Sequence, residues 1–165
     1  MPNAIIGLGS NVGDRVKYIE TSITKISDFL RIRKISSVYQ SDSLLTDGQI
    51  KYYNIVLSGD TYYKAVELLY ILKNIEKEVG RIKRGKWKER EIDLDIIDFD
   101  RNILQSEELI LPHKHTHKRS FVLYPLREIE PAYIHPKINL NIDKMIAQLE
   151  NNLDIRKIGE IEWQL

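Results

Sequence analysis

The sequence predicts an α+β domain built on one antiparallel sheet, and its patterns of apolar residues carry that prediction. Four runs rich in apolar and β-branched residues are suited to strands: 3–8, 31–39, 52–57 and 92–99. Two stretches repeat apolar residues at helical spacing: 16–30 and 68–79. The resulting order, β-α-β-β-α-β, is that of a ferredoxin-like sheet. In this arrangement the helices pack on one face, and we expect a site on the other, loop-lined face.

The first strand is expected to end at Gly9, where turn residues begin. We interpret the glycine-rich stretch 7–13 as a tight turn into the first helix. It lacks the G-x-G-x-x-G spacing of a dinucleotide-binding motif and the acidic residue that such a motif requires, so we do not assign that function. The third strand, 52–57, is predicted to be central because it is aromatic and β-branched.

The second half of the chain is less regular. Gly80 stands where a C-cap glycine would end the second helix. After the fourth strand, a hairpin turn is predicted at 100–102. The final third is expected to hold two short helices and a last strand: 119–127, 142–149 and 154–158.

Length and composition narrow the class of protein. The chain has 165 residues, which favours a single domain over 1–165. It contains no cysteine, so disulfides, thiolate metal sites and a cysteine nucleophile are excluded. Lys and Arg number 25 against 24 Asp and Glu, so no nucleic-acid partner is expected. There is no signal-peptide pattern and no apolar run that could span a bilayer, and we therefore expect a cytoplasmic protein without membrane association.

Two carboxylates on the fourth strand form the sharpest motif. Side chains alternate between the faces of a strand, so Asp93 and Asp95 share one face while Leu94 points to the other. The two aspartates are about 6.6 Å apart on a strand that rises ~3.3 Å per residue, so both can reach one or two cations. Hard oxygen ligands suit Mg²⁺, which takes a few carboxylates together with substrate phosphates. The alternative is an amphipathic strand with two exposed Asp, although Asp is disfavoured in strands and like charges on one face repel.

A basic loop runs directly into this strand. Six of the ten residues from Arg81 to Arg90 are Lys or Arg. Alone, such a loop is typical of a solvated linker, but beside a carboxylate pair it can neutralise the charge of a polyphosphate. The two features together indicate nucleoside-triphosphate chemistry, and no P-loop of the G-x-x-x-x-G-K-[ST] type accompanies them. Because the loop is polar and cationic, we also expect it to close over a bound nucleotide.

Three of the four histidines, His113, His115 and His117, lie at alternate positions. They leave three interpretations open: a zinc site, exposed polar residues, or contacts to phosphate. On a strand the three rings would point the same way, and three adjacent rings rarely converge on one ion. Asn54 lies inside the apolar third strand, where a buried amide must find hydrogen-bond partners. An amide that faces an open site could instead pair with the edge of a heterocycle.

Taken together, these residues resemble a known family, the 6-hydroxymethyl-7,8-dihydropterin pyrophosphokinases of folate biosynthesis. The resemblance covers nearly the whole chain, in segments that read IIGLGSNVGDR, SSVYQSD, YYN, EVGRIKRGKWKEREIDLDII, LPHKHTHKRSFVLYPL and EIEP. Its most specific part is R-x-I-D-L-D-I from Arg90, followed by L-P-H from Leu111 and R-S-F-V-L-x-P-L from Arg119. The resemblance implies transfer of the β,γ-pyrophosphoryl group of ATP to the pterin hydroxymethyl group, with release of AMP.

The resemblance also implies roles for individual residues. Asp93 and Asp95 match the ligands of two Mg²⁺ ions. One group of positions is implied to contact ATP phosphates or to belong to closing loops: Arg81, Lys83, Arg90, His113 and Arg119. A second group is implied to bind the pterin, by pairing with the ring, by stacking on it or through backbone groups at its edge: Asn54, Tyr52, Phe121, Leu44 and Leu45.

The chain departs from the family pattern in places. Lys83 stands where an arginine is often found and lacks the forked geometry of a guanidinium. The stretch 41–43 is more polar than usual. Two rival functions stay open: a nucleotidyl transferase, which would release pyrophosphate, and a non-catalytic ligand- or RNA-binding module on the same fold. The near-neutral charge argues against RNA. Besides ATP and the pterin, neighbouring folate-pathway enzymes are potential partners.

Overall fold

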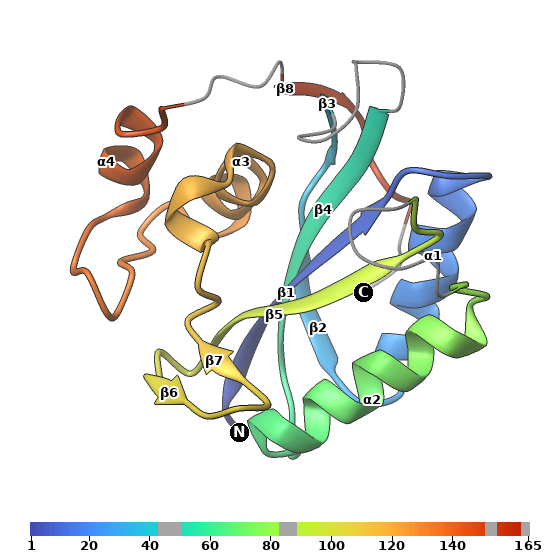
Figure 1. Ribbon diagram of the computed structural model, residues 1–165, viewed down its shortest axis with the longest axis horizontal. Helices are drawn as coiled ribbons and strands as arrows, with labels where there is room; N and C mark the ends of the chain where they lie inside the picture. The colour runs from blue at the N-terminus through green and yellow to red at the C-terminus, as the bar shows by residue number, and fades with distance from the viewer. Residues whose placement is uncertain (43–50, 83–88, 151–154, 163–165) are drawn as a thin grey trace.

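The computed structural model describes residues 1–42, 51–82, 89–150 and 155–162. In the first part of the chain one helix follows the first strand, and a second helix follows three successive strands; shorter elements come later (Figure 1). The strands are β1 (Asn3–Ser10), β2 (Arg31–Ile35), β3 (Val38–Asp42), β4 (Lys51–Asp60), β5 (Asp93–Phe99), β6 (Leu104–Gln105), β7 (Ile110–Leu111) and β8 (Ile155–Gly159). The helices are α1 (Arg15–Ile26), α2 (Ala65–Glu78), α3 (Ser120–Ile129) and α4 (Ile142–Ala147), with a 3₁₀ turn, η1 (Thr116–Lys118).

One antiparallel sheet organises the molecule. Its strand order is β5-β1-β4-β3-β8, and β2 pairs with β4 as well. The third predicted strand, now β4, is central as expected. The predicted α+β class with a ferredoxin-like antiparallel sheet is thereby confirmed. A separate two-stranded ribbon joins β6 to β7.

The stretch 31–39, predicted as one strand, consists of parts of two strands. β2 and β3 pair with successive parts of the same edge of β4 and are separated by two serines. The Ser36 hydroxyl accepts the N–H of Val56 at 3.0 Å, and the N–H of Ser36 donates to the Val56 carbonyl at 2.9 Å. The prediction was wrong here because a serine side chain takes over one bond of the ladder, which an alternating apolar pattern does not reveal.

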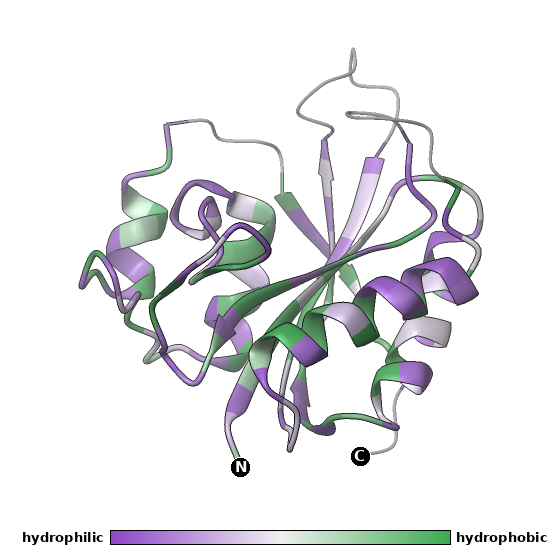
Figure 2. Cartoon of the chain, turned by 60° about the horizontal axis from the view of Figure 1, so that its bottom comes forward, coloured by the Kyte–Doolittle hydropathy of each residue, from purple (hydrophilic) through white to green (hydrophobic). Residues whose placement is uncertain are grey.

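The first face of the sheet supports α1 and α2 and forms the larger core. Side chains from β1, which lies between β5 and β4, and from both helices are buried there: Ala4, Ile6, Leu8, Ile19, Ile23, Ile26, Leu68, Leu72 and Ile75. Figure 2 shows hydrophobic residues along the strands, while the helices carry both hydrophobic and hydrophilic residues. Since burying one Leu or Ile side chain contributes roughly 1.5–3 kcal/mol, this face supplies much of the stabilising free energy.

The C-terminal end of α2 is fixed by Gly80, as predicted. Its φ of +104° lies in the left-handed region, which glycine adopts without steric cost. The N–H of Arg81 donates to the Glu76 carbonyl at 3.0 Å, and the N–H of Gly80 donates to the Lys77 carbonyl at 3.1 Å. These two bonds form a Schellman motif, which ends the helix and turns Arg81 back toward β5.

The second face of the sheet is partly covered by α3 and α4, whereas the prediction left this face free of helices. Figure 1 shows both helices on the side opposite α1 and α2. A second apolar cluster joins them to the sheet through Ile5, Val56 and Ile97, none of which is more than 5% exposed. This apolar strip on the sheet had to be buried, and the helices that bury it come from the irregular final third of the chain. None of the helices in the described ranges is both long and apolar enough to cross a membrane.

The glycine-rich stretch after the first strand is not the turn that was predicted. β1 continues through Gly9 to Ser10, so Gly7 and Gly9 are strand residues. The turn lies further on, where Gly13 has a φ of +66°. The two earlier glycines therefore do not change the direction of the chain. They lie on the face of the sheet that lines the pocket described below.

The turn predicted after the fourth strand exists, but the hairpin does not. Asp100 and Arg101 have positive φ values of 53° and 56°, as in a tight turn. The strand that follows, β6, pairs with β7 and not with β5. The short helices and the last strand predicted in the final third are present, with bounds moved by a few residues.

Candidate active site

On the second face of the sheet, the residue types of three neighbouring strands change from apolar to glycine, polar or aromatic along the strand. Each has an apolar residue in the cluster beneath α3 and, further along the same face, glycine, polar or aromatic residues: Ile5, Gly7 and Gly9 on β1; Val56, Asn54 and Tyr52 on β4; Ile97, Asp95 and Asp93 on β5. The apolar cover therefore stops where the strand residues cease to be apolar. The part of the face that α3 leaves uncovered is a pocket.

Gly9 lies at the centre of this uncovered area. It pairs with Asn54 of β4 on one side and with Asp93 of β5 on the other. Since neighbouring strands lie about 4.8 Å apart, Asn54 and Asp93 stand about 10 Å apart across Gly9. A Cβ atom at position 9 would come within 3.1 Å of the Asn54 Oδ1 atom. The glycine therefore leaves room for the amide and for a ligand above the strand.

The pocket brings together most of the residues predicted from the sequence. Those that line it are Tyr52, Asn54, Arg90, Asp93, Asp95, Arg119 and Phe121. Arg81 and His113 are outside the lining, although Arg81 is bonded to Asp93 and the charge of Asp95 acts on His113. The remaining predicted positions, Lys83, Leu44 and Leu45, lie outside the described residues, as does most of the basic loop.

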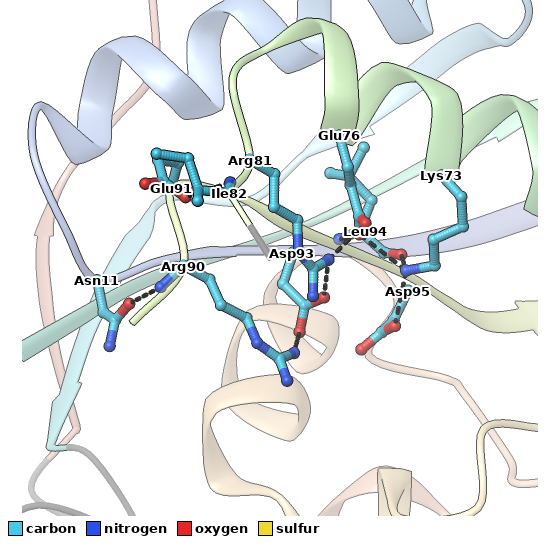
Figure 3. A network of polar contacts seen from close by, with 10 residues as sticks. All are labelled: Asn11, Lys73, Glu76, Arg81, Ile82, Arg90, Glu91, Asp93, Leu94 and Asp95. Carbon is cyan, nitrogen blue, oxygen red and sulfur yellow. Dashed lines mark hydrogen bonds and ion pairs between the residues drawn. The ribbon is translucent and has the colours of Figure 1, made fainter. Parts of the chain in front are cut away.

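Asp93 is held by two arginines from the two ends of the basic segment. Nη1 of Arg81 lies 2.8 Å from one carboxylate oxygen, and Nη1 of Arg90 lies 2.6 Å from the other (Figure 3). Burial raises the pKa of the Asp93 carboxyl, but the charges of Lys73, Arg90 and Arg81 outweigh it and hold the pKa below its ordinary value. The side chain is therefore ionised at neutral pH, which is the state that can ligate a metal ion.

Asp95 has fewer partners among the described residues. Its side chain is 34% exposed, and Nζ of Lys73 lies 3.7 Å from Oδ1. Leu94, between the two aspartates, is fully buried in the core. The predicted alternation is thus confirmed, with carboxylates on the pocket face and apolar side chains on the core face.

The two carboxylates fit a magnesium ion that takes its other ligands from elsewhere. Among the described residues, no group of three or more His, Asp or Glu side chains is arranged to hold a metal ion. A cation at Asp93 and Asp95 would complete its shell with water and phosphate oxygens, which is the way Mg²⁺ binds at phosphoryl-transfer sites. The guanidinium groups of Arg81 and Arg90 around Asp93 would then lie beside the phosphates.

The other end of the pocket is formed by an amide and two aromatic rings. Asn54 is 6% exposed and donates from Nδ2 to the Ser41 hydroxyl at 3.0 Å. Tyr52 lies on the same face of β4 as Asn54. Burial raises the pKa of its hydroxyl. Phe121 comes from α3, with the Arg119 guanidinium 5.6 Å from its ring centre. This set can stack on a planar heterocycle and hydrogen-bond its edge.

The histidines of the predicted cluster do not share one direction, because they lie in a turn and in η1 rather than in a strand. The rings of His113 and His115 are 6.0 Å apart, whereas His117 packs on the fourth histidine, His135, at 5.7 Å. Burial lowers the pKa of the His113 imidazole, and the charge of Asp95 opposes that shift. The described residues give no support to a zinc site.

Several residues that support the site were missed in the sequence. Glu76 of α2 is buried and pairs with Arg81, and the side chain of Asn11 accepts the N–H of Arg90 at 2.7 Å. Glu76 left a signal, because it continues the apolar stripe of α2 four residues after Leu72, where a charged residue is out of place. Ser41 was indicated more weakly, because it belongs to the stretch 41–43 that is more polar than the family pattern.

Comparison with known proteins agrees with this description. Residues 5–131 match the family model of 7,8-dihydro-6-hydroxymethylpterin-pyrophosphokinase (HPPK). A 2-amino-4-hydroxy-6-hydroxymethyldihydropteridine pyrophosphokinase of Aquifex aeolicus is 46% identical over 136 residues, which cover 82% of this chain and 85% of that protein. The Bacillus subtilis protein of the same name is 37% identical over 128 residues, which cover 76% of this chain and 77% of that protein.

Longer proteins contain a similar unit. The folic acid synthesis protein fol1 of Pneumocystis carinii is 38% identical over 154 residues, which are 93% of this chain and 21% of that protein. A solved HPPK-DHPS structure of Plasmodium falciparum shares the fold, with a TM-score of 0.72 at 16% identity, and the match covers 89% of this chain and 43% of that chain. This chain therefore spans less than half of these two longer proteins. The match to the family model and the identity with the bacterial relatives show that the chain belongs to the HPPK family.

Proposed function

We propose that this protein transfers the pyrophosphoryl group of ATP to 6-hydroxymethyl-7,8-dihydropterin and releases AMP, as a step of folate biosynthesis. Membership of the HPPK family supports the reaction. The observation that carries the proposal is the row of Asp93, Gly9 and Asn54 across three adjacent strands. It places a carboxylate suited to a metal ion and an amide suited to a heterocycle in one pocket, on either side of a residue without a side chain.

The amide end of the pocket would hold the pterin. Asn54 offers a donor and an acceptor to the edge of the ring, and its contact with Ser41 fixes the orientation of the amide. Tyr52 and Phe121 would stack on the ring from β4 and α3. The hydroxymethyl group would then point along the row toward Asp93 and Asp95, which is the direction from which the nucleotide has to approach.

The cationic end of the pocket would hold the triphosphate. The hydroxymethyl oxygen would attack the β-phosphorus and release its proton to water. The bond from that phosphorus to the oxygen that bridges it to the α-phosphorus would break, and this oxygen would leave with AMP. Arg81, Arg90 and Arg119, together with Lys83 and His113, would offset negative charge on the pyrophosphoryl unit and on AMP. Most of the work asked of the protein is therefore positioning and neutralisation of charge.

ATP and magnesium dependence is general in the family, and we propose two Mg²⁺ ions at Asp93 and Asp95. The two carboxylates line the pocket together and supply the oxygen ligands that Mg²⁺ prefers. When bound, magnesium would neutralise phosphate charge and orient the oxygens of the displacement. The exposure of Asp95 and the ionised state of Asp93 support this assignment.

Other enzymes of folate synthesis are proposed as partners. The relatives in which this unit is one part of a longer chain include a folic acid synthesis protein and an HPPK-DHPS protein. In the HPPK-DHPS protein, HPPK shares one chain with DHPS. A cytoplasmic location, expected from the sequence, stays a prediction.

Incubation with ATP, Mg²⁺ and 6-hydroxymethyl-7,8-dihydropterin tests the proposal, with the nucleotides and phosphates separated by chromatography. We expect AMP and the pterin diphosphate in equal amounts. Release of free pyrophosphate would instead indicate a nucleotidyl transferase. Binding of the ligands without turnover would indicate a non-catalytic module, and either result would contradict the proposal.

A further inference from the structure

The outer edge of β5 is closed by side chains of α2. In the described part of the sheet, β5 pairs with β1 alone. At Leu94 the backbone N–H donates to Oε1 of Glu76 at 2.7 Å, and the backbone carbonyl accepts from Nζ of Lys73 at 2.7 Å (Figure 3). Two side chains on adjacent turns of α2 thus take the place of a neighbouring strand.

Leu94 stands between the two carboxylates of the proposed magnesium site. Its own side chain is buried in the core, whereas Asp93 and Asp95 on either side of it line the pocket. Side-chain direction follows the backbone in a strand, so holding the Leu94 peptide groups also holds the directions of both carboxylates. Without Glu76 and Lys73, these two peptide groups would lose the bonds that fix this stretch of the edge.

Glu76 also sets the position of Arg81. Its Oε2 atom forms an ion pair with Nη1 of Arg81, and the same nitrogen lies 2.8 Å from Oδ1 of Asp93. Glu76 is 4% exposed and does not line the pocket. It therefore contacts the backbone and a side chain of the site from behind, at a place that a ligand in the pocket does not reach.

We propose that Glu76 is a positioning residue for pyrophosphoryl transfer, which holds the backbone between Asp93 and Asp95 and aims Arg81 at Asp93. The inference rests on the proposed function, because it concerns the same site. A displacement of about 1 Å at reacting groups can cost about 10²-fold in rate, so loss of Glu76 should act on kcat. Within the described residues, the hydrogen bonds and ion pairs of Glu76 go to Lys73, Arg81 and Leu94 and not to Asn54 at the pterin end of the pocket. The KM for pterin should therefore stay nearly constant.

Two substitutions separate the contacts of Glu76. Glu76→Gln keeps an oxygen that can accept the N–H of Leu94 but loses the ion pairs with Arg81 and Lys73, and Glu76→Leu loses all three contacts. We expect kcat to fall in the order wild type, Gln, Leu, with a loss of about 10²-fold for Leu and a change in the KM for pterin of less than about twofold. Removing one partner of a buried ion pair costs stability when the remaining charge is left unpaired. In Glu76→Leu, however, Arg81 keeps Asp93 as a partner, and the Lys73 side chain is 38% exposed. We therefore expect the variant to fold, which thermal unfolding would verify.

A matched control comes from the same helix. Glu78 lies two residues further on, is 48% exposed in its side chain and pairs with Lys25 at 2.7 Å. Glu78→Leu should leave kcat unchanged. A readout independent of activity is hydrogen exchange of the Leu94 amide in the metal-free protein, which should be faster in Glu76→Leu than in Glu76→Gln or wild type.

Three results would overturn the proposal: a folded Glu76→Leu variant with wild-type kcat, equal losses of kcat in the Gln and Leu variants, or unchanged exchange of the Leu94 amide. A wild-type protein that forms no AMP would refute the proposed function instead. In that case the amide exchange still tests whether Glu76 holds this edge of the sheet, so the two failures are distinguishable.

Discussion

The two faces of the sheet are closed in different ways. Beneath α1 and α2 the strand residues form one continuous apolar core, whereas the opposite face is apolar only beneath α3 and then opens into the pocket. The alternate residues of β1 show the difference: Ala4, Ile6 and Leu8 face α1 and α2, and Ile5, Gly7 and Gly9 face the other way. One strand thus contributes to a core with one set of positions and to a site with the other.

This comparison indicates where stability and function are located. Substitutions on the first face should change the free energy of unfolding and leave ligand binding intact. Substitutions in the uncovered part of the second face should act on binding or turnover with little effect on folding, because few apolar contacts are lost there. Residues beneath α3 lie between these cases and should affect both.

The largest effect is expected from Asp95→Asn. The substitution removes a charge and an oxygen ligand from the pocket, so turnover should fall by about 10³-fold or more while the thermal unfolding temperature changes little. AMP release and a thermal melt measure the two quantities. Asp100→Asn is the matched control, since Asp100 is exposed at the end of the same strand and Asn tolerates its φ of 53°. Near-normal turnover in Asp95→Asn would contradict the magnesium assignment.

A pair of core substitutions compares the two faces directly. Leu72 and Leu123 are both fully buried, the first in the α2 core and the second in α3. Each Leu→Ala change should cost about 2–5 kcal/mol in the free energy of unfolding, measured with urea. Only Leu123→Ala should also raise the KM for pterin, because α3 carries Phe121 into the pocket. Equal effects of both substitutions on this KM would remove the distinction between the faces.

Gly9→Ala should have a smaller and more local effect. A methyl group there would come within 3.1 Å of the Asn54 Oδ1 atom and would shift the amide. We expect the Kd for pterin to rise about tenfold, or ~1.4 kcal/mol, with the Kd for nucleotide nearly unchanged in calorimetry. Gly159→Ala, in β8, serves as the control because a Cβ atom there meets nothing within 4 Å. Equal weakening of both ligands would place the pterin elsewhere.

The smallest effect concerns how α3 is held on the second face. Glu128 accepts the N–H and the hydroxyl of Ser37 at 3.1 and 2.7 Å and the hydroxyl of Tyr39 at 2.7 Å. Burial raises the pKa of the Glu128 carboxyl, but these hydrogen bonds outweigh it and lower the pKa. The stability that the carboxylate contributes is therefore present above the ordinary pKa of Glu and is lost as pH falls through the lowered one.

Glu128→Gln should accordingly be less stable than wild type by about 1 kcal/mol at pH 7. The difference should shrink as the pH falls below about 4, where the wild-type carboxyl takes up its proton. Urea unfolding at neutral and acid pH measures both values. A difference that does not depend on pH would mean that the charge of Glu128 does not anchor α3.

Local patterns in the sequence were sufficient to predict much of the first face of the sheet and the acidic strand. The apolar stripe of α2, its glycine cap at Gly80 and the alternation around Asp93 and Asp95 each depend on spacing along one element, and the structure agrees with them. The pterin-binding roles of Asn54 and Phe121 came from the family resemblance. The pocket places both residues together, and their roles stay a prediction.

The rest depends on contacts between elements that no local pattern encodes. Gly7 and Gly9 were assigned to a turn, because glycine in a strand has a reason only when the neighbouring strand and the ligand space are known. Helix α3 packs over Ile5, although the two segments are more than a hundred residues apart in the sequence. Glu76 was not predicted as a site residue, because the pattern of α2 does not show that its partners lie on β5 and beyond the end of the helix.

A crystal structure with 6-hydroxymethyl-7,8-dihydropterin, Mg²⁺ and a non-hydrolysable ATP analogue tests the central claim most directly. We predict the pterin ring above Gly9, between Tyr52 and Phe121, with the Asn54 amide within hydrogen-bonding distance of its edge. Metal density should lie at Asp93 and Asp95, beside the phosphates. A pterin ring bound away from Gly9, or metal ions bound without either aspartate, would contradict the account.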